Sequence, residues 1–179
     1  VNIFGGIMNC DIIADGIASL DHPGNRRLMQ VVAERKLLLT VQVEGDLLAQ
    51  SLPALLASGA SICVDHCGRP DPALGLHQPG FEALLELGRQ GHAVKLSGPF
   101  RFTHEAAPYR DTLPYIDAIV RTFTPARCCW GSDWPYLRAN SRLDYAPGLK
   151  LLESWLPDAE VRAQVLSDTP RRLFGFSPA

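Results

Sequence analysis

Apolar runs of strand length alternate along the chain with longer stretches in which apolar residues recur at helical spacing. The short runs predict five strands, at residues 1–4, 37–43, 61–65, 93–97 and 128–131. The helical spacing predicts helices over residues 25–36, 47–58, 79–87, 108–123, 143–156, 158–166 and 168–174. Pro53 falls inside the second of these stretches, so a break in that helix is expected.

Single helices between successive strands predict an α/β fold. Parallel strands need crossover connections of this kind, and the strands are largely apolar, as in a sheet covered on both faces. A doubly wound sheet and a (β/α)8 TIM barrel both satisfy the pattern. No strand is followed by a glycine-rich dinucleotide turn or a phosphate-binding loop, which disfavours the nucleotide-binding versions of the doubly wound sheet.

Composition narrows the class of protein further. The chain has 179 residues, of which 46% are apolar, and a formal net charge of -2. These values are ordinary for one soluble globular domain, and the balance of charge gives no basic footprint for nucleic acid. No apolar run approaches the length of a membrane helix, and the first residues lack the features of a signal peptide. We therefore expect a cytoplasmic protein without nucleic-acid or membrane partners.

The five cysteines do not indicate a disulfide framework, because their number is odd. Cys63, His66 and Cys67 lie close together and raise the question of structural zinc. Such a site needs four ligands, usually from two clusters, and the sequence has no second cluster. Buried thiols in a reducing compartment are the better interpretation.

Polar residues gather where the predicted strands end. In a parallel barrel the carboxyl ends of the strands, and the loops after them, carry the catalytic groups. Four strand ends carry candidates of this kind, namely Gln42, then His66 and Arg69, then Lys95 and Arg101, and finally Asp133. One polar cluster at a strand end means little, but four at one edge of a sheet would converge on one pocket.

These residue types suit water attack on an ester or lactone carbonyl. Asp133, set between Trp130 and Trp134, can accept a proton from water. A histidine such as His66 and a nearby arginine can polarise a carbonyl, and a further arginine can hold a substrate carboxylate. His66 and Asp133 are also acceptable metal ligands, so metal-activated water is the neighbouring possibility.

Two motifs make the pattern specific. Residues 64–70, Val-Asp-His-Cys-Gly-Arg-Pro, and residues 130–135, Trp-Gly-Ser-Asp-Trp-Pro, resemble the signatures of the amidohydrolase 2 branch of the amidohydrolase superfamily. That branch contains 2-pyrone-4,6-dicarboxylate lactonase and related sugar and muconolactone lactonases, some of which serve in the degradation of aromatic compounds. The resemblance covers nearly the whole chain and implies a TIM barrel.

The resemblance also implies roles for individual residues. Asp133 matches the general base, His66 matches the histidine that polarises the lactone carbonyl, and Arg69 and Arg101 match arginines that contact substrate carboxylates. Lys95 and Gln42 are predicted as further substrate-binding residues. The dicarboxylate lactonase works without a bound metal, whereas other superfamily members use zinc or manganese. The expected cofactor is therefore none, or a single divalent metal that His66 and Asp133 would help to hold.

The sequence departs from the family at its start. Family members begin with a strand that carries His-x-His, and no His-x-His occurs here. Residues 1–4 match a strand inside the barrel, so we expect residues 1–179 to form a single partial TIM-barrel domain without the first strands. An incomplete barrel exposes two sheet edges. A second copy in a homo-oligomer, or residues outside the chain, are expected to cover them.

Three functions remain open at this point. The first is a hydrolase that opens the lactone of a small anionic molecule, with the activity of this chain on its own unresolved. The second is a decarboxylase or a zinc or manganese hydrolase of the superfamily that acts on an aromatic or muconate-type acid. The third is a non-catalytic relic or an interaction module.

Overall fold

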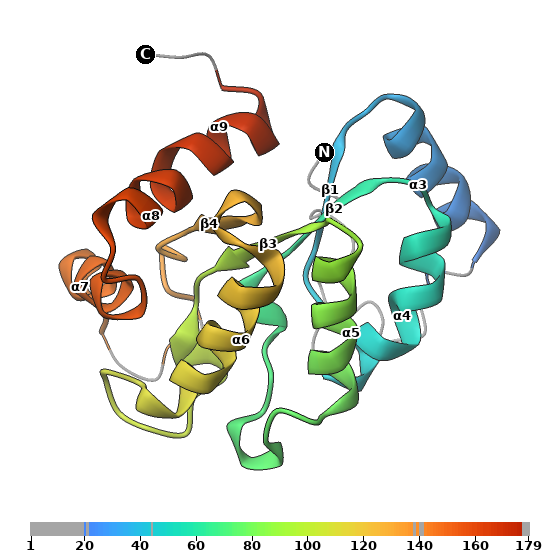
Figure 1. The fold of residues 1–179 in the computed structure, drawn as a ribbon. Coiled ribbons are helices and arrows are strands. Elements are labelled where there is room, and N and C mark those ends of the chain that lie inside the picture. The colour runs from blue at the N-terminus through green and yellow to red at the C-terminus, as the bar shows by residue number, and fades with distance from the viewer. Residues whose placement is uncertain (1–19, 21, 44, 138, 140–141, 177–179) are drawn as a thin grey trace.

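The computed structural model describes residues 20, 22–43, 45–137, 139 and 142–176 (Figure 1). Four of the predicted strands lie within this part of the chain, and all four are confirmed. They are β1 (Leu38–Val41), β2 (Ser61–Val64), β3 (Ala93–Leu96) and β4 (Cys128–Trp130). The fifth prediction, at residues 1–4, lies outside the described residues.

The four strands form one parallel sheet in the order β1-β2-β3-β4. Consecutive strands are neighbours, with Val41 beside Val64 and Leu96 beside Trp130 at the carboxyl ends. The residues that follow the strands therefore meet at one edge of the sheet, as the sequence predicts.

The predicted helices are present, with shifted boundaries. The structure contains α3 (Pro23–Glu34), α4 (Asp46–Ala57), α5 (Pro79–Arg89), α6 (Leu113–Phe123), α7 (Tyr145–Trp155), α8 (Ala159–Ala163) and α9 (Thr169–Phe174). A π-helical turn, Gln164–Asp168, joins α8 to α9. No helix in the described part of the chain is both long enough and apolar enough to cross a membrane.

Two details of the helix prediction are wrong. Helix α4 continues through Pro53, because that residue lies on the exposed side while Leu48 and Leu55 anchor both halves of the helix in the core. Helix α6 begins five residues later than predicted. Tyr109 has a left-handed backbone (φ 54°), which a right-handed helix cannot contain.

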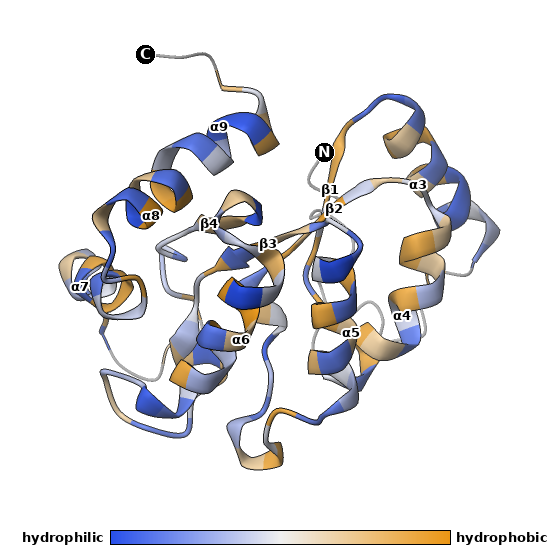
Figure 2. Ribbon diagram, in the orientation of Figure 1, coloured by the Kyte–Doolittle hydropathy of each residue, from blue (hydrophilic) through white to orange (hydrophobic). Residues whose placement is uncertain are grey.

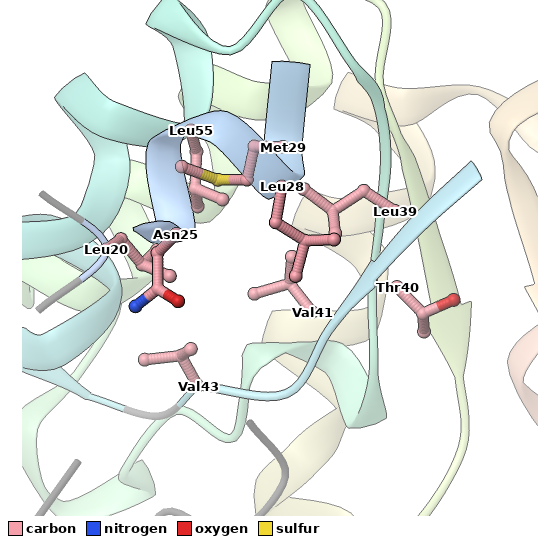
Figure 3. Close-up of a pocket in the computed structure, with 9 residues that line it drawn as sticks. All are labelled: Leu20, Asn25, Leu28, Met29, Leu39, Thr40, Val41, Val43 and Leu55. Carbon is pink, nitrogen blue, oxygen red and sulfur yellow. The ribbon is translucent and has the colours of Figure 1, made fainter. Parts of the chain in front are cut away.

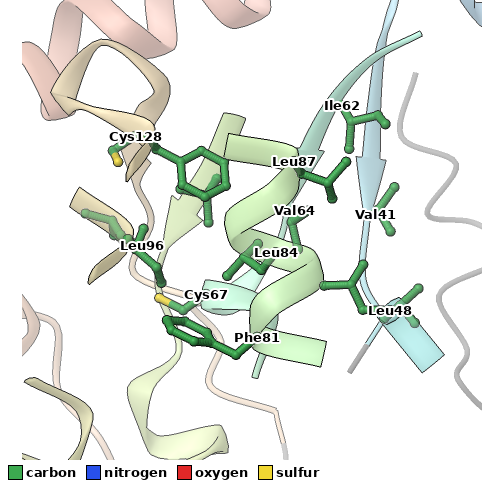
Figure 4. Packing of buried hydrophobic residues seen from close by; sticks show 14 of the residues in the cluster. Val41, Leu48, Ile62, Val64, Cys67, Phe81, Leu84, Leu87, Leu96 and Cys128 are labelled. Carbon is green, nitrogen blue, oxygen red and sulfur yellow. The ribbon is translucent and has the colours of Figure 1, made fainter. Parts of the chain in front are cut away.

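The helices α3 to α6 pack on one face of the sheet. Alternate strand residues, such as Val64 and Leu96, share a buried cluster with side chains from all four helices. Figure 4 shows Phe81, Leu84 and Leu87 of α5 over these strand residues. Helices α5 and α6 are accordingly banded with hydrophobic and hydrophilic colours, whereas β1 and β2 are largely hydrophobic (Figure 2).

The other face of the sheet carries a second, smaller cluster. Cys63 of β2, Ala93 of β3 and Cys129 of β4 are buried together, with Leu38 and Leu173 packed against them. A doubly wound sheet would carry crossover helices on both faces, whereas a barrel keeps its helices outside and its strands inside. The crossover helices α4, α5 and α6 all pack on one side, and only Leu173 of the terminal α9 is placed against this second cluster, which favours the incomplete barrel that the sequence predicts.

A small apolar hollow lies where α3 approaches β1 (Figure 3). Leu28 and Met29 of α3 face Leu39 and Val41 of β1 across it, and its volume is about 10 Å³. That volume is about the minimum that admits one water molecule. The hollow is a packing imperfection of the helix layer and no binding site for a small molecule.

Helices α5 and α6 approach closely at Gly88, and a side chain there is expected to destabilise the fold. A Cβ atom at Gly88 would lie 2.7 Å from Cδ2 of the buried Phe123. We expect Gly88→Ala to lower the free energy of unfolding by about 1–3 kcal/mol in urea titrations, the usual cost of overpacking. Gly148→Ala in α7 is the control. Its nearest neighbour would lie 3.8 Å away, so it should be neutral or slightly stabilising.

Candidate active site

The turn after β2 places His66 at the carboxyl edge of the sheet. Four consecutive residues have left-handed backbone angles, with φ values of 51° at His66, 56° at Cys67, 69° at Gly68 and 48° at Arg69. Non-glycine residues rarely adopt this region, and each one costs free energy. Backbone hydrogen bonds from Gly68 N to Asp65 O and from Arg69 N to His66 O close the turn.

The His66 imidazole is buried and contacts groups from two other strand ends. Its Nδ1 lies 2.9 Å from Oγ of Ser97, which directly follows β3. Its Nε2 lies 3.7 Å from Oδ1 of Asp133, beyond β4. Burial, and then the positive charges of Lys95, Arg69 and Arg101, lower the pKa of His66 to about 2. The imidazole is therefore neutral at physiological pH.

Asp133 forms an ion pair with Arg101 as well as facing His66. The Arg101 Nε donates to Oδ2 of Asp133, and both side chains are 13% exposed. Gly98 makes room for this arrangement. A Cβ atom there would stand 2.9 Å from His66 Nδ1 and 3.0 Å from Asp133 Oδ2. The three side chains therefore converge over a bare stretch of backbone.

A buried ion pair lies beside this group, on the inner face of the sheet. The Nζ of Lys95 is 2.6 Å from Oδ1 of Asp65, whose side chain is fully buried. Burial raises the pKa of Asp65, and the Lys95 ammonium offsets part of that rise. Burial lowers the pKa of Lys95, but the Asp65 carboxylate, with smaller contributions from Cys63 and Cys129, outweighs this effect, so the pKa of Lys95 is raised. The 2.6 Å contact makes each group the ion-pair partner of the other.

The remaining predicted residues lie at the same edge. Arg69 is half-buried, and its charge acts on both His66 and Asp65. Gln42 is half-buried directly after β1. The structure thus brings His66, Asp133 and Arg101 into one cluster, with Arg69 and Lys95 close enough to shift pKa values in it. Their roles in binding or catalysis stay predictions.

Sequence reasoning missed three contributors to this site. Ser97 and Gly98 belong to the polar end of β3, and Asp65 lies within the first motif, so a signal for each existed. That signal did not show that Ser97 would contact His66, that Gly98 would leave space for two side chains, or that Asp65 would pair with Lys95.

His104 ties two loops of the site together. Its Nε2 lies 2.8 Å from Oδ1 of Asp71, and its backbone N–H donates to Oδ2 of Asp111. Asp71 belongs to the loop that carries Arg69, and His104 to the loop that carries Arg101. The contact is exposed to solvent and does not reach His66 or Asp133.

A cavity of about 650 Å³ borders the cluster. Ser97, Gly98 and Ser132 contribute to its wall, and each contacts or adjoins a residue of the cluster. Aromatic side chains supply much of the rest, from Phe100, Tyr109, Trp130, Tyr136 and Trp155. This volume falls within the range of small-molecule binding sites.

The described residues do not by themselves form a metal site. His66 and Asp133 are suitable ligands, but no group of three or more histidine, cysteine, aspartate or glutamate side chains is arranged to hold a metal ion in the part of the chain that the structure describes. The second oxygen of Asp133 is engaged by Arg101. The four described cysteines, Cys63, Cys67, Cys128 and Cys129, are buried and free.

Comparison with known families decides the classification. The profile of the amidohydrolase family matches residues 14–176. The chain belongs to the amidohydrolase family. The match includes both motifs and the whole cluster around His66 and Asp133, so the resemblance read from the two motifs is confirmed.

Two relatives of the chain carry names that refer to lactones. The 4-sulfomuconolactone hydrolase of Rhizobium radiobacter is 37% identical over 126 residues, which are 67% of this chain and 42% of that protein. The D-galactarolactone isomerase of Agrobacterium fabrum is 28% identical over 174 residues, 91% of this chain and 59% of that protein. The structure of a probable 2-pyrone-4,6-dicarboxylic acid hydrolase from Acinetobacter baumannii superimposes with a TM-score of 0.80 at 24% identity.

The superposition confirms the fold as the α/β architecture of that enzyme, present in part. It covers 98% of this chain and 63% of the other. The chain therefore spans between about two fifths and two thirds of the length of these proteins.

The neutral state of His66 predicts a stability that falls in acid. The unfolded chain binds a proton at this residue near its ordinary pKa of about 6.5, whereas the folded chain binds it only near pH 2. Stability is therefore lost as the pH drops below about 6.5. Between pH 7 and pH 5 this group alone should cost about 2 kcal/mol.

Urea titrations of the wild type and His66→Gln at both pH values check this expectation. The variant should lose about 2 kcal/mol less than the wild type over that interval. Other titrating groups, including His92, contribute to both proteins and cancel in the difference. Equal losses in the two proteins would contradict the neutral, buried state of His66.

Proposed function

We propose that the protein to which this chain belongs hydrolyses a lactone of a small anionic molecule. The observation that carries the proposal is the convergence of Asp133, His66 and Arg101 at the carboxyl edge of the sheet. The two relatives named as a lactone hydrolase and a lactone isomerase support the proposal. The cavity beside the cluster has room for such a molecule.

Substrate binding would begin at the arginines. A substrate carboxylate that pairs with the Arg101 guanidinium competes directly with Asp133, because Arg101 already donates to Oδ2 of that residue. Arg69 offers a second positive charge nearby. Once Arg101 turns to the substrate, Oδ2 of Asp133 is free to accept a proton.

The chemical step would then use Asp133 and His66 together. Asp133 takes a proton from a water molecule as the water oxygen attacks the lactone carbonyl carbon. The neutral imidazole of His66 donates a hydrogen bond to the carbonyl oxygen, where negative charge develops. Collapse of the tetrahedral intermediate breaks the ring C–O bond, and the alkoxide takes up the proton held by Asp133. The products are a hydroxyl group and a carboxylic acid, which keeps the second proton of the water molecule and releases it to solvent as it ionises to the carboxylate.

A divalent metal, if bound at this site, would supply a polarised water or carbonyl. His66 and Asp133 are the candidate ligands in this chain. Zinc or manganese is the expected identity from the superfamily. The residues described above provide binding, proton transfer and charge stabilisation.

Turnover of a lactone panel tests the proposal. The panel would contain 2-pyrone-4,6-dicarboxylate, 4-sulfomuconolactone and the neutral γ-butyrolactone, followed by acid release at constant pH. We expect hydrolysis of the anionic members and at least tenfold lower kcat/KM for the neutral one. A correctly folded full-length protein that hydrolyses none of them, with or without added zinc or manganese, would overturn the proposal.

Lactone isomerisation is the second candidate, because one relative carries the name of a lactone isomerase. The two reactions differ in the nucleophile. Hydrolysis in ¹⁸O-labelled water places the label in the product carboxylate. Isomerisation transfers the acyl group to a neighbouring hydroxyl of the substrate, so no label enters the product.

A further inference from the structure

The side chain of Ser97 is buried and contacts the His66 imidazole. It follows β3 directly, is 1% exposed, and holds its Oγ 2.9 Å from Nδ1 of His66. Within the described part of the chain, this contact is the only hydrogen bond of the Ser97 hydroxyl. The direction in which the Ser97 hydroxyl proton points therefore depends on which ring nitrogen of His66 carries a proton. The position of that ring proton depends in turn on the hydroxyl.

A neutral imidazole carries its proton on one nitrogen, and the two arrangements differ in cost at this site. If Nδ1 carried the proton, Ser97 would accept it, and the hydroxyl proton of Ser97 would be buried without an acceptor. If Nε2 carries the proton, Ser97 donates to Nδ1 and both groups are satisfied.

The neighbour on the other side of the ring points to the same arrangement. Oδ1 of Asp133 lies 3.7 Å from Nε2. A lone pair on Nε2 would face this carboxylate oxygen, whereas an N–H there is attracted to it. The distance is too long for a direct hydrogen bond, so the N–H stays available to a substrate oxygen.

We propose that Ser97 is a positioning residue that fixes His66 as the Nε2–H tautomer, which makes His66 a hydrogen-bond donor to the substrate carbonyl and leaves the proton-accepting role to Asp133. The inference concerns the ring itself, but its catalytic consequence rests on the proposed lactone hydrolysis. Ser97 acts through His66, and its effect should appear both in the spectrum of the ring and in the rate.

Nitrogen NMR of the full chain, labelled with ¹⁵N-histidine, tests the proposal without any substrate. The His66 signals are assigned by their loss in His66→Gln. We expect the Nε2–H tautomer in the wild type, and a ratio of the two tautomers about tenfold less in favour of Nε2–H in Ser97→Ala. Ser97→Thr retains the hydroxyl and should retain the wild-type ratio.

Ser58→Ala provides a matched control for the loss of a buried hydroxyl. Ser58 is also buried and donates to the backbone O of Leu55, at the far end of α4 from the site. It should leave the His66 signals unchanged. A wild type with the proton on Nδ1, or a tautomer ratio in Ser97→Ala equal to that of the wild type, would overturn the proposal.

Kinetics give a second measurement where lactone turnover is found. Ser97→Ala should lower kcat about tenfold with KM within twofold of the wild type, and Ser97→Thr should recover most of the loss. An inactive wild type would refute the proposed hydrolysis but would leave the NMR result intact. Unchanged kcat in Ser97→Ala, in an active protein, would refute the catalytic consequence of the tautomer.

Discussion

Replacing Asp133 by asparagine is expected to lower kcat for lactone hydrolysis by about 10²–10⁴-fold, the usual contribution of a positioned general base. Asparagine matches aspartate in size and can still accept from Arg101 through its carbonyl oxygen. It cannot take a proton from water at neutral pH. The rate is therefore expected to fall while the fold, followed by circular dichroism and urea titration, is retained.

Asp117→Asn is the matched control for this substitution. Asp117 lies on α6 and is exposed to solvent, so its replacement should leave kcat within twofold of the wild type. Equal activity in Asp133→Asn and Asp117→Asn would contradict the assignment of Asp133 as the base. Loss of activity accompanied by loss of the folded signal would instead require Asp133→Glu as a second variant, which keeps the charge and should retain measurable turnover.

Removal of the Lys95 ammonium is expected to produce the largest loss of stability. Lys95→Met preserves most of the side-chain volume but leaves the Asp65 carboxylate fully buried without its ion-pair partner. Breaking a buried pair in this way costs roughly 3–5 kcal/mol. Urea titrations at pH 7 measure the change in the free energy of unfolding.

Two further variants separate the pair from its surroundings. Arg27→Met breaks an exposed ion pair, Arg27 with Glu34, and should cost less than about 1 kcal/mol. The double variant Lys95→Met with Asp65→Asn removes both charges and should be more stable than Lys95→Met alone. A cost for Lys95→Met no greater than that of Arg27→Met would show that the Asp65 charge is compensated by other means.

The convergence of the site could be predicted because it depends on one property of parallel sheets. Apolar runs locate the strands, and parallel strands place their carboxyl ends at one edge. His66, Arg101 and Asp133 follow three different strands, so their proximity follows from the order of strands alone. The structure brings these three together as expected.

The partners within the site could not be predicted in the same way. Lys95 stands out in the sequence as a charge in an apolar strand, which suggests a role in binding an anion. The structure gives it an internal anion, Asp65, because both residues point to the inner face of the sheet from neighbouring strands. Whether a side chain meets a substrate or a neighbour depends on distances of a few ångström that spacing along the chain does not contain.

The choice between a barrel and a doubly wound sheet was also beyond the periodicity of the sequence. Both folds bury the strands on two faces and use amphipathic helices as crossovers. The difference is the side on which each helix packs, and helices α3 to α6 all pack on one side here. The motif resemblance supplied that information before the structure did.

The left-handed turn from His66 to Arg69 has a consequence for how this protein can change during evolution. Substitutions that relax the turn, such as glycine at Arg69, would remove backbone strain, but they would also free the imidazole from its fixed direction. Selection for a more stable protein and selection for a faster enzyme therefore act in opposite directions on the same few residues. Gains in thermal stability are best sought elsewhere, for example in the exposed positions of α3 and α7.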